Sequence, residues 1–237
     1  MEKPVAKRVL IKISGEALAG EKKTGYDFDI VSRVCETIKA CADEGVQIGI
    51  VIGGGNFWRG VKDGAGKVER VSADRMGMLA TVMNCMAVCD VFRQLGASAR
   101  VMTSVDIQGV GERYDTRRSV EALERGEIVL FAGGTGNPFF STDTAAVLRA
   151  LEIGADAILL AKNIDGVYSD DPRVNPAAEK FDVIRYEEVL ARRLAVMDTA
   201  ATSLAMDNRI PLDVFALAEP ENIRRVLYGE AIGTKVF

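Results

Sequence analysis

Short runs of apolar residues alternate along this chain with longer segments in which apolar residues recur every three or four positions. Short runs bounded by glycine predict buried strands, and the longer periodic segments predict helices. The predicted strands cover residues 9–14, 47–52, 99–102, 128–132, 157–161 and 212–216. The predicted helices cover residues 29–44, 72–95, 115–125, 144–153, 186–194 and 199–208, and Glu219-Pro220 opens one more. This alternation predicts an α/β fold, a three-layer αβα sandwich around a mainly parallel central sheet.

The continuity of this pattern indicates the domain organisation. The chain has 237 residues, enough to bury a sizeable core in one large domain. No internal repeat or low-complexity linker interrupts the alternation, although residues 162–178 are irregular. We therefore expect a single domain, residues 1–237, with two lobes that share one sheet.

The longest predicted helix, residues 72–95, carries an apolar stripe. Ser72 is a good N-cap, and Gly96 stands at the stop position. The stripe consists of Met76, Leu79, Met83 and Met86. Methionines at helical spacing commonly fill cores or subunit interfaces, so we assign the stripe to packing rather than to a ligand site.

Composition narrows the class of partner. The net charge is −4, and Lys and Arg are scattered rather than clustered as on a nucleic-acid-binding face. No apolar run approaches the roughly 20 residues that span a bilayer. The N-terminal segment passes directly into a strand without a signal-peptide cleavage pattern. We expect a cytoplasmic protein whose partners are neither nucleic acid nor a membrane.

Cysteine and histidine usage restricts the chemistry. The four cysteines lack the C-x-x-C spacing of structural zinc sites, so we expect buried free thiols. The chain has no histidine, which excludes a Ser-His-Asp triad, a Cys-His pair and a His-ligated metal. Any reaction must therefore use lysine, arginine, carboxylates, hydroxyls and backbone groups.

Glycines follow three of the predicted strands, at Gly15, at residues 53–55 and at residues 133–136. In parallel α/β sheets the ligand crevice lies at the carboxyl ends of the strands, so these turns are expected to surround one anionic ligand. Neither standard phosphate fingerprint is present. Residues 60–68 have the wrong glycine spacing for a Walker A motif, and we interpret them as a flexible surface loop.

The segment 131–146, FAGGTGNPFFSTDTAA, combines a strand end, a glycine turn, two aromatics and a hydroxyl-rich helix start. Phe139 and Phe140 supply apolar faces, and free N–H groups at a helix start favour anions. The alternative is a capped loop with two buried phenylalanines. The clustering of all four features favours a site for a phosphorylated ring compound.

Three charged residues near the glycine turns are candidates for ligand contacts. Lys12 stands inside an apolar strand, where it either points at phosphate or lies at a solvated rim. Arg59 follows the triglycine turn and suits bidentate phosphate binding. Asp74 in the first turn of the helix at 72–95 either favours the helix dipole or accepts from sugar hydroxyls.

A further candidate is the segment 162–172, KNIDGVYSDDP, which also begins at a strand end. Its aromatic residue, Tyr168, can stack on a base, and its acids, Asp170 and Asp171, can accept from ribose hydroxyls. A plain polar loop is the alternative.

Taken together, these motifs resemble the bacterial UMP kinases (uridylate kinases) of the amino acid kinase superfamily. The motifs are KISGEAL at Lys12, VIGGGNFWRG at Val51, DRMGMLATVMN at Asp74, GGTGNPFFSTDTAA at Gly133, DGVYSDDP at Asp165 and VMDTAA at Val196. They cover essentially the whole chain. Related kinases for amino acids or carbamate share the lysine-glycine turn and a DTAA-like helix start, but not the TGNPFF loop.

The resemblance implies an amino acid kinase (carbamate kinase-like) fold and phosphorylation of UMP to UDP by ATP, in pyrimidine nucleotide biosynthesis. The lobe of about residues 1–160 would hold the acceptor UMP, and the lobe of about residues 161–237 would hold ATP with Mg²⁺. The implied catalytic residues are Lys12, Arg59 and Asp143, with Asp143 orienting the lysine. The implied ATP contacts are Lys12, Ile13, Ser14, Gly15, Gly55, Arg59, Lys162 or Asn163, Tyr168 and Asp171. The implied UMP contacts are Gly54, Asp74, Thr135, Gly136, Asn137, Pro138, Phe139, Phe140, Ser141 and Thr142.

This activity is consistent with the missing histidine. The acceptor phosphate oxygen is already anionic near neutral pH, so the transfer needs charge neutralisation and in-line positioning rather than a general base. Asp143, Asp171 and Asp198 are acids that could approach Mg²⁺, and the sequence does not rank them.

The resemblance also implies a homohexamer built partly through the methionine-rich helix. UTP inhibition and GTP activation are regulatory options of the family, and residues 20–26 correspond to a region linked to GTP activation in some relatives. Two other hypotheses keep the same fold: a kinase for another acceptor, and a non-catalytic nucleotide sensor or storage protein. Phe139, Phe140 and Asp74 argue against the first, and Lys12, Arg59 and Asp143 argue against the second.

Overall fold

A computed structural model of the protein describes residues 3–59 and 66–237. Within those residues, a nine-stranded sheet has the order β4-β3-β5-β2-β1-β6-β10-β11-β9. The strands are β1 (Arg8–Ile13), β2 (Gln47–Ile52), β3 (Ala99–Thr103), β4 (Glu112–Arg113), β5 (Ile128–Ala132), β6 (Ala157–Lys162), β9 (Val183–Ile184), β10 (Leu212–Ala216) and β11 (Thr234–Val236). Neighbouring strands are parallel except β10 and β11. Two further strands, β7 (Val167–Tyr168) and β8 (Lys180–Phe181), form a separate antiparallel pair.

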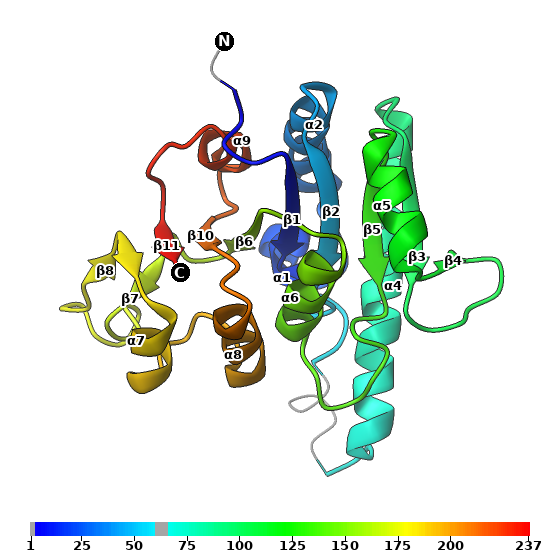
Figure 1. Ribbon diagram of the computed structural model, residues 1–237. Coiled ribbons are helices and arrows are strands. Elements are labelled where there is room, and N and C mark those ends of the chain that lie inside the picture. Colours follow the sequence, from blue (N-terminus) through cyan, green and yellow to red (C-terminus); the bar gives the residue numbers. More distant parts are fainter. Residues whose placement is uncertain (1–2, 60–65) are drawn as a thin grey trace.

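Helices cover both faces of this sheet (Figure 1). One face packs against α1 (Gly15–Ala19), α2 (Phe28–Asp43), α4 (Arg70–Gln94) and α9 (Asn222–Leu227). The other face packs against α5 (Thr116–Glu124), α6 (Thr142–Glu152), α7 (Tyr186–Ala191) and α8 (Thr199–Asp207). A short 3-10 helix, η1 (Gly20–Lys22), follows α1. The predicted three-layer αβα sandwich with a mainly parallel sheet is therefore confirmed.

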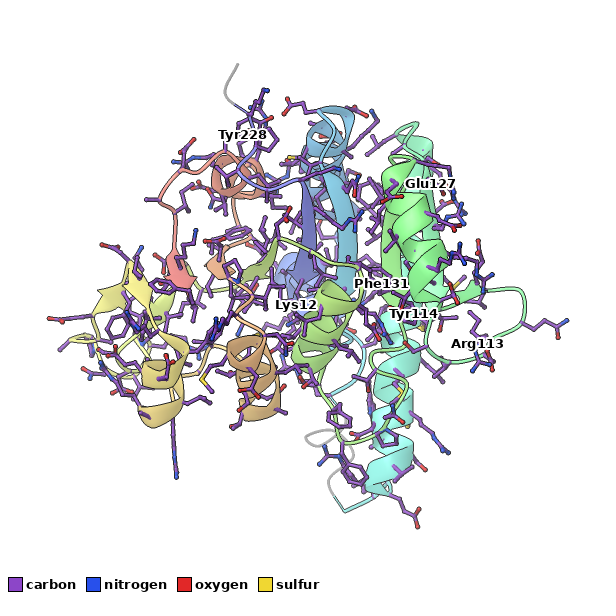
Figure 2. The ribbon with its side chains drawn as sticks, viewed as in Figure 1. Lys12, Arg113, Tyr114, Glu127, Phe131 and Tyr228 are labelled. Atoms are coloured by element: carbon purple, nitrogen blue, oxygen red, sulfur yellow. The ribbon has the colours of Figure 1, made fainter. Side chains whose placement is uncertain are left out.

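Strand alternation in β1 decides where its charged residue points. Val9, Ile11 and Ile13 belong to the core under α2 and α4, whereas Leu10 belongs to the core under α6. Because successive side chains on a strand alternate between the two faces, Lys12 lies on the same face as Leu10. The sequence of β1 therefore directs Lys12 toward α6, as Figure 2 shows.

The predicted strands are present with bounds that differ by no more than one residue, and the helix ends differ slightly more. The long helix α4 begins at Arg70, with Glu69 rather than Ser72 at its N-cap. The short strands β4, β9 and β11 and the helix α1 are additional elements, too brief to leave a hydrophobic period. Residues 60–65 of the loop predicted at 60–68 lie outside the described residues.

The helix α4 projects beyond the lower edge of the sheet in Figure 1. Its apolar stripe is not core: Met76, Leu79, Met83 and Met86 have exposed fractions between 40% and 50%. The core-packing alternative for this stripe is therefore wrong for the single chain. By length and composition alone α4 could also cross a membrane, but more than half of its most apolar window is buried against the protein, as in a core helix.

Candidate active site

The three glycine turns lie side by side at one edge of the sheet. They follow β1, β2 and β5, which are adjacent and parallel, so their carboxyl ends meet at the same edge. The first two turns touch, because a Cβ on Gly15 would lie only 2.1 Å from the carbonyl oxygen of Gly53. Only glycine fits this contact.

A buried pair of asparagines supports these turns. Asn56, after the triglycine turn, donates to the side-chain oxygen of Asn84 on α4 at 3.0 Å, and Asn84 donates back at 2.7 Å. Asn84 also donates to the Gly53 carbonyl at 2.7 Å, and Asn56 donates to the Gly25 carbonyl at 2.9 Å. Both side chains are almost fully buried, and their amide groups hold the turn against α4.

Lys12 forms a nearly buried ion pair with Asp143. Its Nζ lies 2.6 Å from Asp143 Oδ1, and its side chain is only 10% exposed. Asp143 is placed by the start of α6, where Ser141 is the N-cap and accepts from the backbone N–H groups of Asp143 and Thr144. The solvated-rim alternative for Lys12 is therefore wrong.

A second cation and a second acid flank this pair. The ammonium of Lys162, at the end of β6, donates to the Val196 carbonyl. Burial lowers the pKa of Lys162, Asp143 acts to raise this pKa, and the charge of Lys12 acts to lower it. Asp198 caps α8 by accepting from the Ala201 N–H at 2.9 Å.

Asp198 also joins α8 to α6. Its carboxylate accepts from the Ser141 hydroxyl and, at 3.2 Å, from the Thr144 hydroxyl. The starts of α6 and α8 are therefore bound to each other.

Two cavities lined by described residues lie at this edge, and the larger of them has a volume of about 560 Å³. Of the predicted ATP contacts, Lys12, Ser14, Lys162, Asn163, Tyr168 and Asp171 line it. Ile13, Gly15, Gly55 and Arg59 are not among its described lining residues, and the Ile13 side chain lies in the core. Arg59 reaches the rim indirectly, because its Nη2 lies 2.5 Å from the lining residue Glu16.

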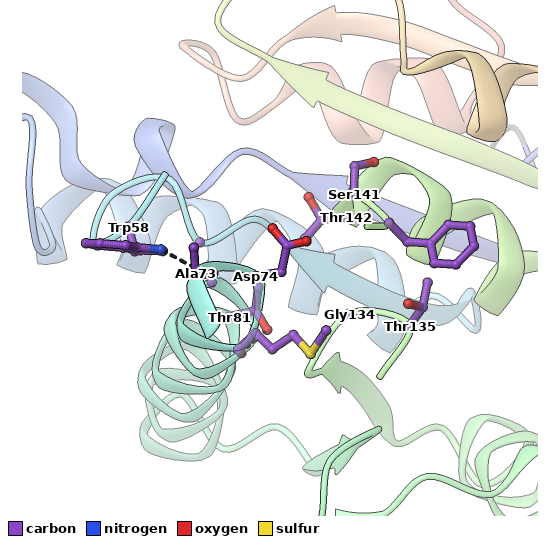
Figure 3. Close-up of a pocket in the computed structure, with 12 residues that line it drawn as sticks. Trp58, Ala73, Asp74, Thr81, Gly134, Thr135, Ser141 and Thr142 are labelled. Carbon is purple, nitrogen blue, oxygen red and sulfur yellow. Dashed lines mark hydrogen bonds between the residues drawn. The ribbon is translucent and has the colours of Figure 1, made fainter. Parts of the chain in front are cut away.

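The smaller cavity, of about 150 Å³, lies between the start of α4 and the loop after β5 (Figure 3). Of the predicted UMP contacts, Gly54, Asp74, Thr135, Phe140, Ser141 and Thr142 line it. Gly136, Asn137, Pro138 and Phe139 belong to the same loop but do not belong to the described lining. Ser141 and Thr142 come directly before Asp143, so the wall of this cavity continues into the Lys12 pair.

Asp74 is a structural part of this smaller cavity. Because α4 begins at Arg70, Asp74 lies beyond the first turn, and the helix-dipole alternative is wrong. Its carboxylate accepts from the Phe139 N–H at 2.8 Å and pairs with Arg70, whose guanidinium lies over the Phe139 ring. Asp74 therefore joins α4 to the loop after β5.

Comparison with known proteins agrees with this geometry. The profile of the amino acid kinase family matches residues 7–216. The chain belongs to the amino acid kinase family. It is 52% identical to a uridylate kinase of Streptococcus thermophilus over 237 residues, covering 100% of this chain and 97% of that protein.

Solved structures of the family are also similar to this chain. The UMP kinase of Bacillus anthracis is 39% identical, with a TM-score of 0.93 and coverage of 98% of this chain and 96% of its own. The UMP kinase of Ureaplasma parvum is 34% identical, with a TM-score of 0.91 and coverage of 100% and 99%. The residues matched by the family profile include every candidate side chain of both cavities.

This amino acid kinase also has lining residues that the sequence did not single out. In the smaller cavity, Trp58, Met78 and Thr81 join the wall, and the Trp58 ring nitrogen donates to the Ala73 carbonyl at 2.8 Å. In the larger cavity, Arg192 and Arg193 come from the segment after α7. Trp58 could have been identified as the only tryptophan of the chain, inside the GGGNFWRG motif, whereas the two arginines carry no signal in sequence.

The metal expected with ATP has no ready cluster of ligands in the part of the chain that the structure describes. Among residues 3–59 and 66–237, no group of three or more His, Cys, Asp or Glu side chains could hold a metal ion. Asp143 is paired with Lys12, and Asp198 accepts from two hydroxyls. Mg²⁺ commonly binds through one or two carboxylates together with substrate phosphates, which suits entry of the metal with the nucleotide.

Proposed function

We propose that this chain transfers the γ-phosphoryl group of ATP to UMP, giving ADP and UDP. The observation that carries the proposal is the position of the Lys12–Asp143 pair between the two cavities. Lys12 lines the larger one, and Asp143 continues the Ser141-Thr142 wall of the smaller one. Similarity to proteins named uridylate kinase and UMP kinase supports this assignment of substrates.

The two cavities differ in a way that favours one assignment of the nucleotides. The larger cavity suits ATP, because it combines Lys12 and Lys162 near the strand ends with Tyr168 farther out. The smaller cavity suits UMP, because Asp74 offers a carboxylate for ribose hydroxyls and Phe140 offers an apolar face for the base. The proposal accordingly assigns an acceptor lobe to about residues 1–160 and a donor lobe to about residues 161–237, with Lys12, Ser14 and Glu16 of the first lobe also lining the donor cavity.

The chemistry we propose for the site is electrostatic. The acceptor phosphate is already an anion, so no group has to remove a proton. Lys12 neutralises charge that accumulates on the transferred group, and Asp143 keeps the ammonium in place before substrates bind. Lys162 adds a second positive charge beside them, and Arg59 approaches the phosphates from the rim next to Glu16. Bound with ATP, Mg²⁺ would neutralise phosphate charge, and Asp143, Asp171 and Asp198 are the carboxylates that could approach it.

The finer expectations belong to this proposal as well. We place the enzyme in the cytoplasm, as a homohexamer in which the exposed methionines of α4 meet another copy. We also include UTP inhibition and GTP activation in the proposal. Activity assays in the presence of each nucleotide test them. Of the two residues left open as ATP contacts, we favour Lys162 over Asn163, because its ammonium lies near Lys12 and Asp143.

One coupled assay of ADP release tests the activity. ATP is offered with UMP, CMP, dCMP or glutamate, and the Lys12→Ala protein serves as the control for contaminating kinases. We expect rapid turnover with UMP and little with the others. Equal turnover of CMP would contradict uridine specificity, turnover of glutamate would indicate another acceptor, and nucleotide binding without turnover would indicate a sensor or storage protein.

A further inference from the structure

A buried arginine behind the acceptor loop takes no part in the mechanism described above. Arg149 lies on α6 and is only 4% exposed. Its Nη2 donates to the Ser104 hydroxyl at 2.9 Å, and its Nη1 pairs with Glu152. Its Nε has no hydrogen-bond partner among the described residues. Burying such a charge costs free energy, and a buried ion pair returns little of it, so stability alone does not explain this residue.

Ser104 connects this arginine to the acceptor loop. Its hydroxyl donates to the Gly134 carbonyl at 2.9 Å while it accepts from Arg149. Its own carbonyl oxygen lies 3.0 Å from the position that a Cβ on Gly136 would take. Gly134 and Gly136 both have positive φ, of 59° and 79°, so Ser104 lies against the two bends that set the course of the loop.

The guanidinium of Arg149 is held from the opposite side as well. Its central carbon lies 3.7 Å from the centre of the Tyr114 ring, and the Tyr114 hydroxyl donates to Glu152 at 2.6 Å. Tyr114 in turn packs edge-on against Phe131, with ring centres 5.7 Å apart, and Figure 2 shows these two residues together. Arg149 therefore has one orientation, in which Nη2 faces Ser104.

We propose that Arg149 is a positioning residue for the acceptor nucleotide. Acting through Ser104, it holds Gly134 and Thr135 in the geometry that lines the smaller cavity. The same helix thus carries Asp143, which orients Lys12, and Arg149, which orients the loop. This inference rests on the proposed function, because it assigns the smaller cavity to UMP.

Four variants test the proposal: Ser104→Ala, Arg149→Met, their double variant, and Ser104→Thr, which keeps the hydroxyl. We expect Ser104→Ala and Arg149→Met each to raise KM for UMP by at least about tenfold, because Arg149→Met removes one hydrogen bond of the relay and Ser104→Ala removes both. KM for ATP should stay within about twofold. Because Arg149 acts through Ser104, the double variant should be no worse than Ser104→Ala alone. Ser104→Thr should restore most of the affinity.

UMP affinity is also read without turnover, from the fluorescence of Trp58, the sole tryptophan, which lines the smaller cavity. Arg8→Met is the matched control. Arg8 is a partly buried arginine that donates to Gln47 at 2.7 Å and to the Ile153 carbonyl, just beyond the far end of α6. The Arg8→Met substitution should lower the stability of the protein without changing its affinity for UMP.

The proposal is wrong if Ser104→Ala and Arg149→Met lower the melting temperature but leave the affinity for UMP within twofold of the wild type. An equal rise in KM for ATP would also overturn it, since that indicates general loosening. Failure of the proposed function gives a different result. In that case the fluorescence of Trp58 shows that wild-type protein binds UMP, but the coupled assay shows no turnover. The UMP affinities of the variants still decide the role of Arg149. Wild-type protein that does not bind UMP overturns both.

Discussion

The two cavities are built from different kinds of contact. The acceptor loop is tied to distant parts of the chain: the Gly133 N–H donates to Thr81 at 2.9 Å, and the Phe139 N–H donates to Asp74 at 2.8 Å. In the donor cavity, by contrast, the outer wall at residues 165–173 has mainly short-range side-chain contacts, although the Val167 N–H donates to Thr234 at 2.8 Å. Tyr168 bonds Asp165, and Arg173 bonds Asp171, all within one short segment.

This difference indicates where selectivity resides. A loop fixed by α4, Ser104 and the start of α6 presents one shape to its ligand. An acceptor of another shape could bind only if these contacts were broken, which would cost free energy. A wall held by local contacts can adjust without disturbing the core. We therefore expect substitutions on the acceptor side to alter UMP binding strongly, and those on the donor side to alter ATP binding mildly.

The largest effect is expected at the residue between the cavities. Lys12→Ala should lower kcat by at least about a hundredfold with little change in either KM, because the ammonium stabilises charge in the transition state. Steady-state kinetics and thermal unfolding check this. Lys39→Ala, which removes a partly exposed lysine paired with Asp43, is the control. Near-normal turnover of the Lys12 variant would remove this residue from the mechanism.

The next largest effect concerns the acceptor side. Asp74→Ala should raise KM for UMP between about tenfold and a hundredfold, because it removes a charged acceptor that also holds the Phe139 N–H. KM for ATP should change little. Asp90→Ala on the same helix is the control, since Asp90 accepts from Gln94 at the exposed surface. Equal rises in both KM values would contradict separate acceptor and donor sides.

A smaller effect is expected on the donor side. Tyr168→Ala should raise KM for ATP about fivefold to tenfold, because stacking of an aromatic ring contributes about 1 kcal/mol. Tyr168→Phe keeps the ring, loses only the local bond to Asp165 and should behave like the wild type. If Tyr168→Ala instead raises KM for UMP, the assignment of the two nucleotides to the cavities is reversed.

The same contrast explains which parts of the site were predictable. Features local in sequence were visible: the glycine turns, the charge of Lys12 in an apolar strand, and the hydroxyls that open α6. The six longer strands were predicted to within one residue because buried parallel strands leave continuous apolar runs, whereas the short strands were not predicted.

Features that depend on distant pairing were not visible. The bond between Asp74 and Phe139 joins residues 65 positions apart, and only the packing of α4 beside the loop creates it. The Asn56–Asn84 pair and the Arg149–Ser104 contact have the same origin. Helical spacing also could not separate an exposed methionine stripe on α4 from a buried one, because both have the same period.

The smallest expected effect is a change in stability with pH, which compares one charged lining residue of each cavity, Asp74 and Lys162. On the acceptor side Asp74 is already paired with Arg70, whereas on the donor side burial lowers the pKa of Lys162. Between this lowered pKa and the ordinary lysine pKa, the unfolded chain binds more protons than the folded chain. The contribution of Lys162 to the free energy of unfolding must therefore rise with pH across that alkaline window.

Urea unfolding of the wild type and of Lys162→Met at a series of pH values from 7 to 10.5 isolates this contribution, because groups common to both proteins cancel in the difference. We expect the wild type to gain stability relative to the variant as the pH rises. If the difference in free energy of unfolding stays constant or falls as the pH rises, burial does not destabilise the charged form of Lys162. The charge of Lys162 in the donor cavity would then be as well stabilised before ATP binds as the charge of Asp74, paired with Arg70, is before UMP binds.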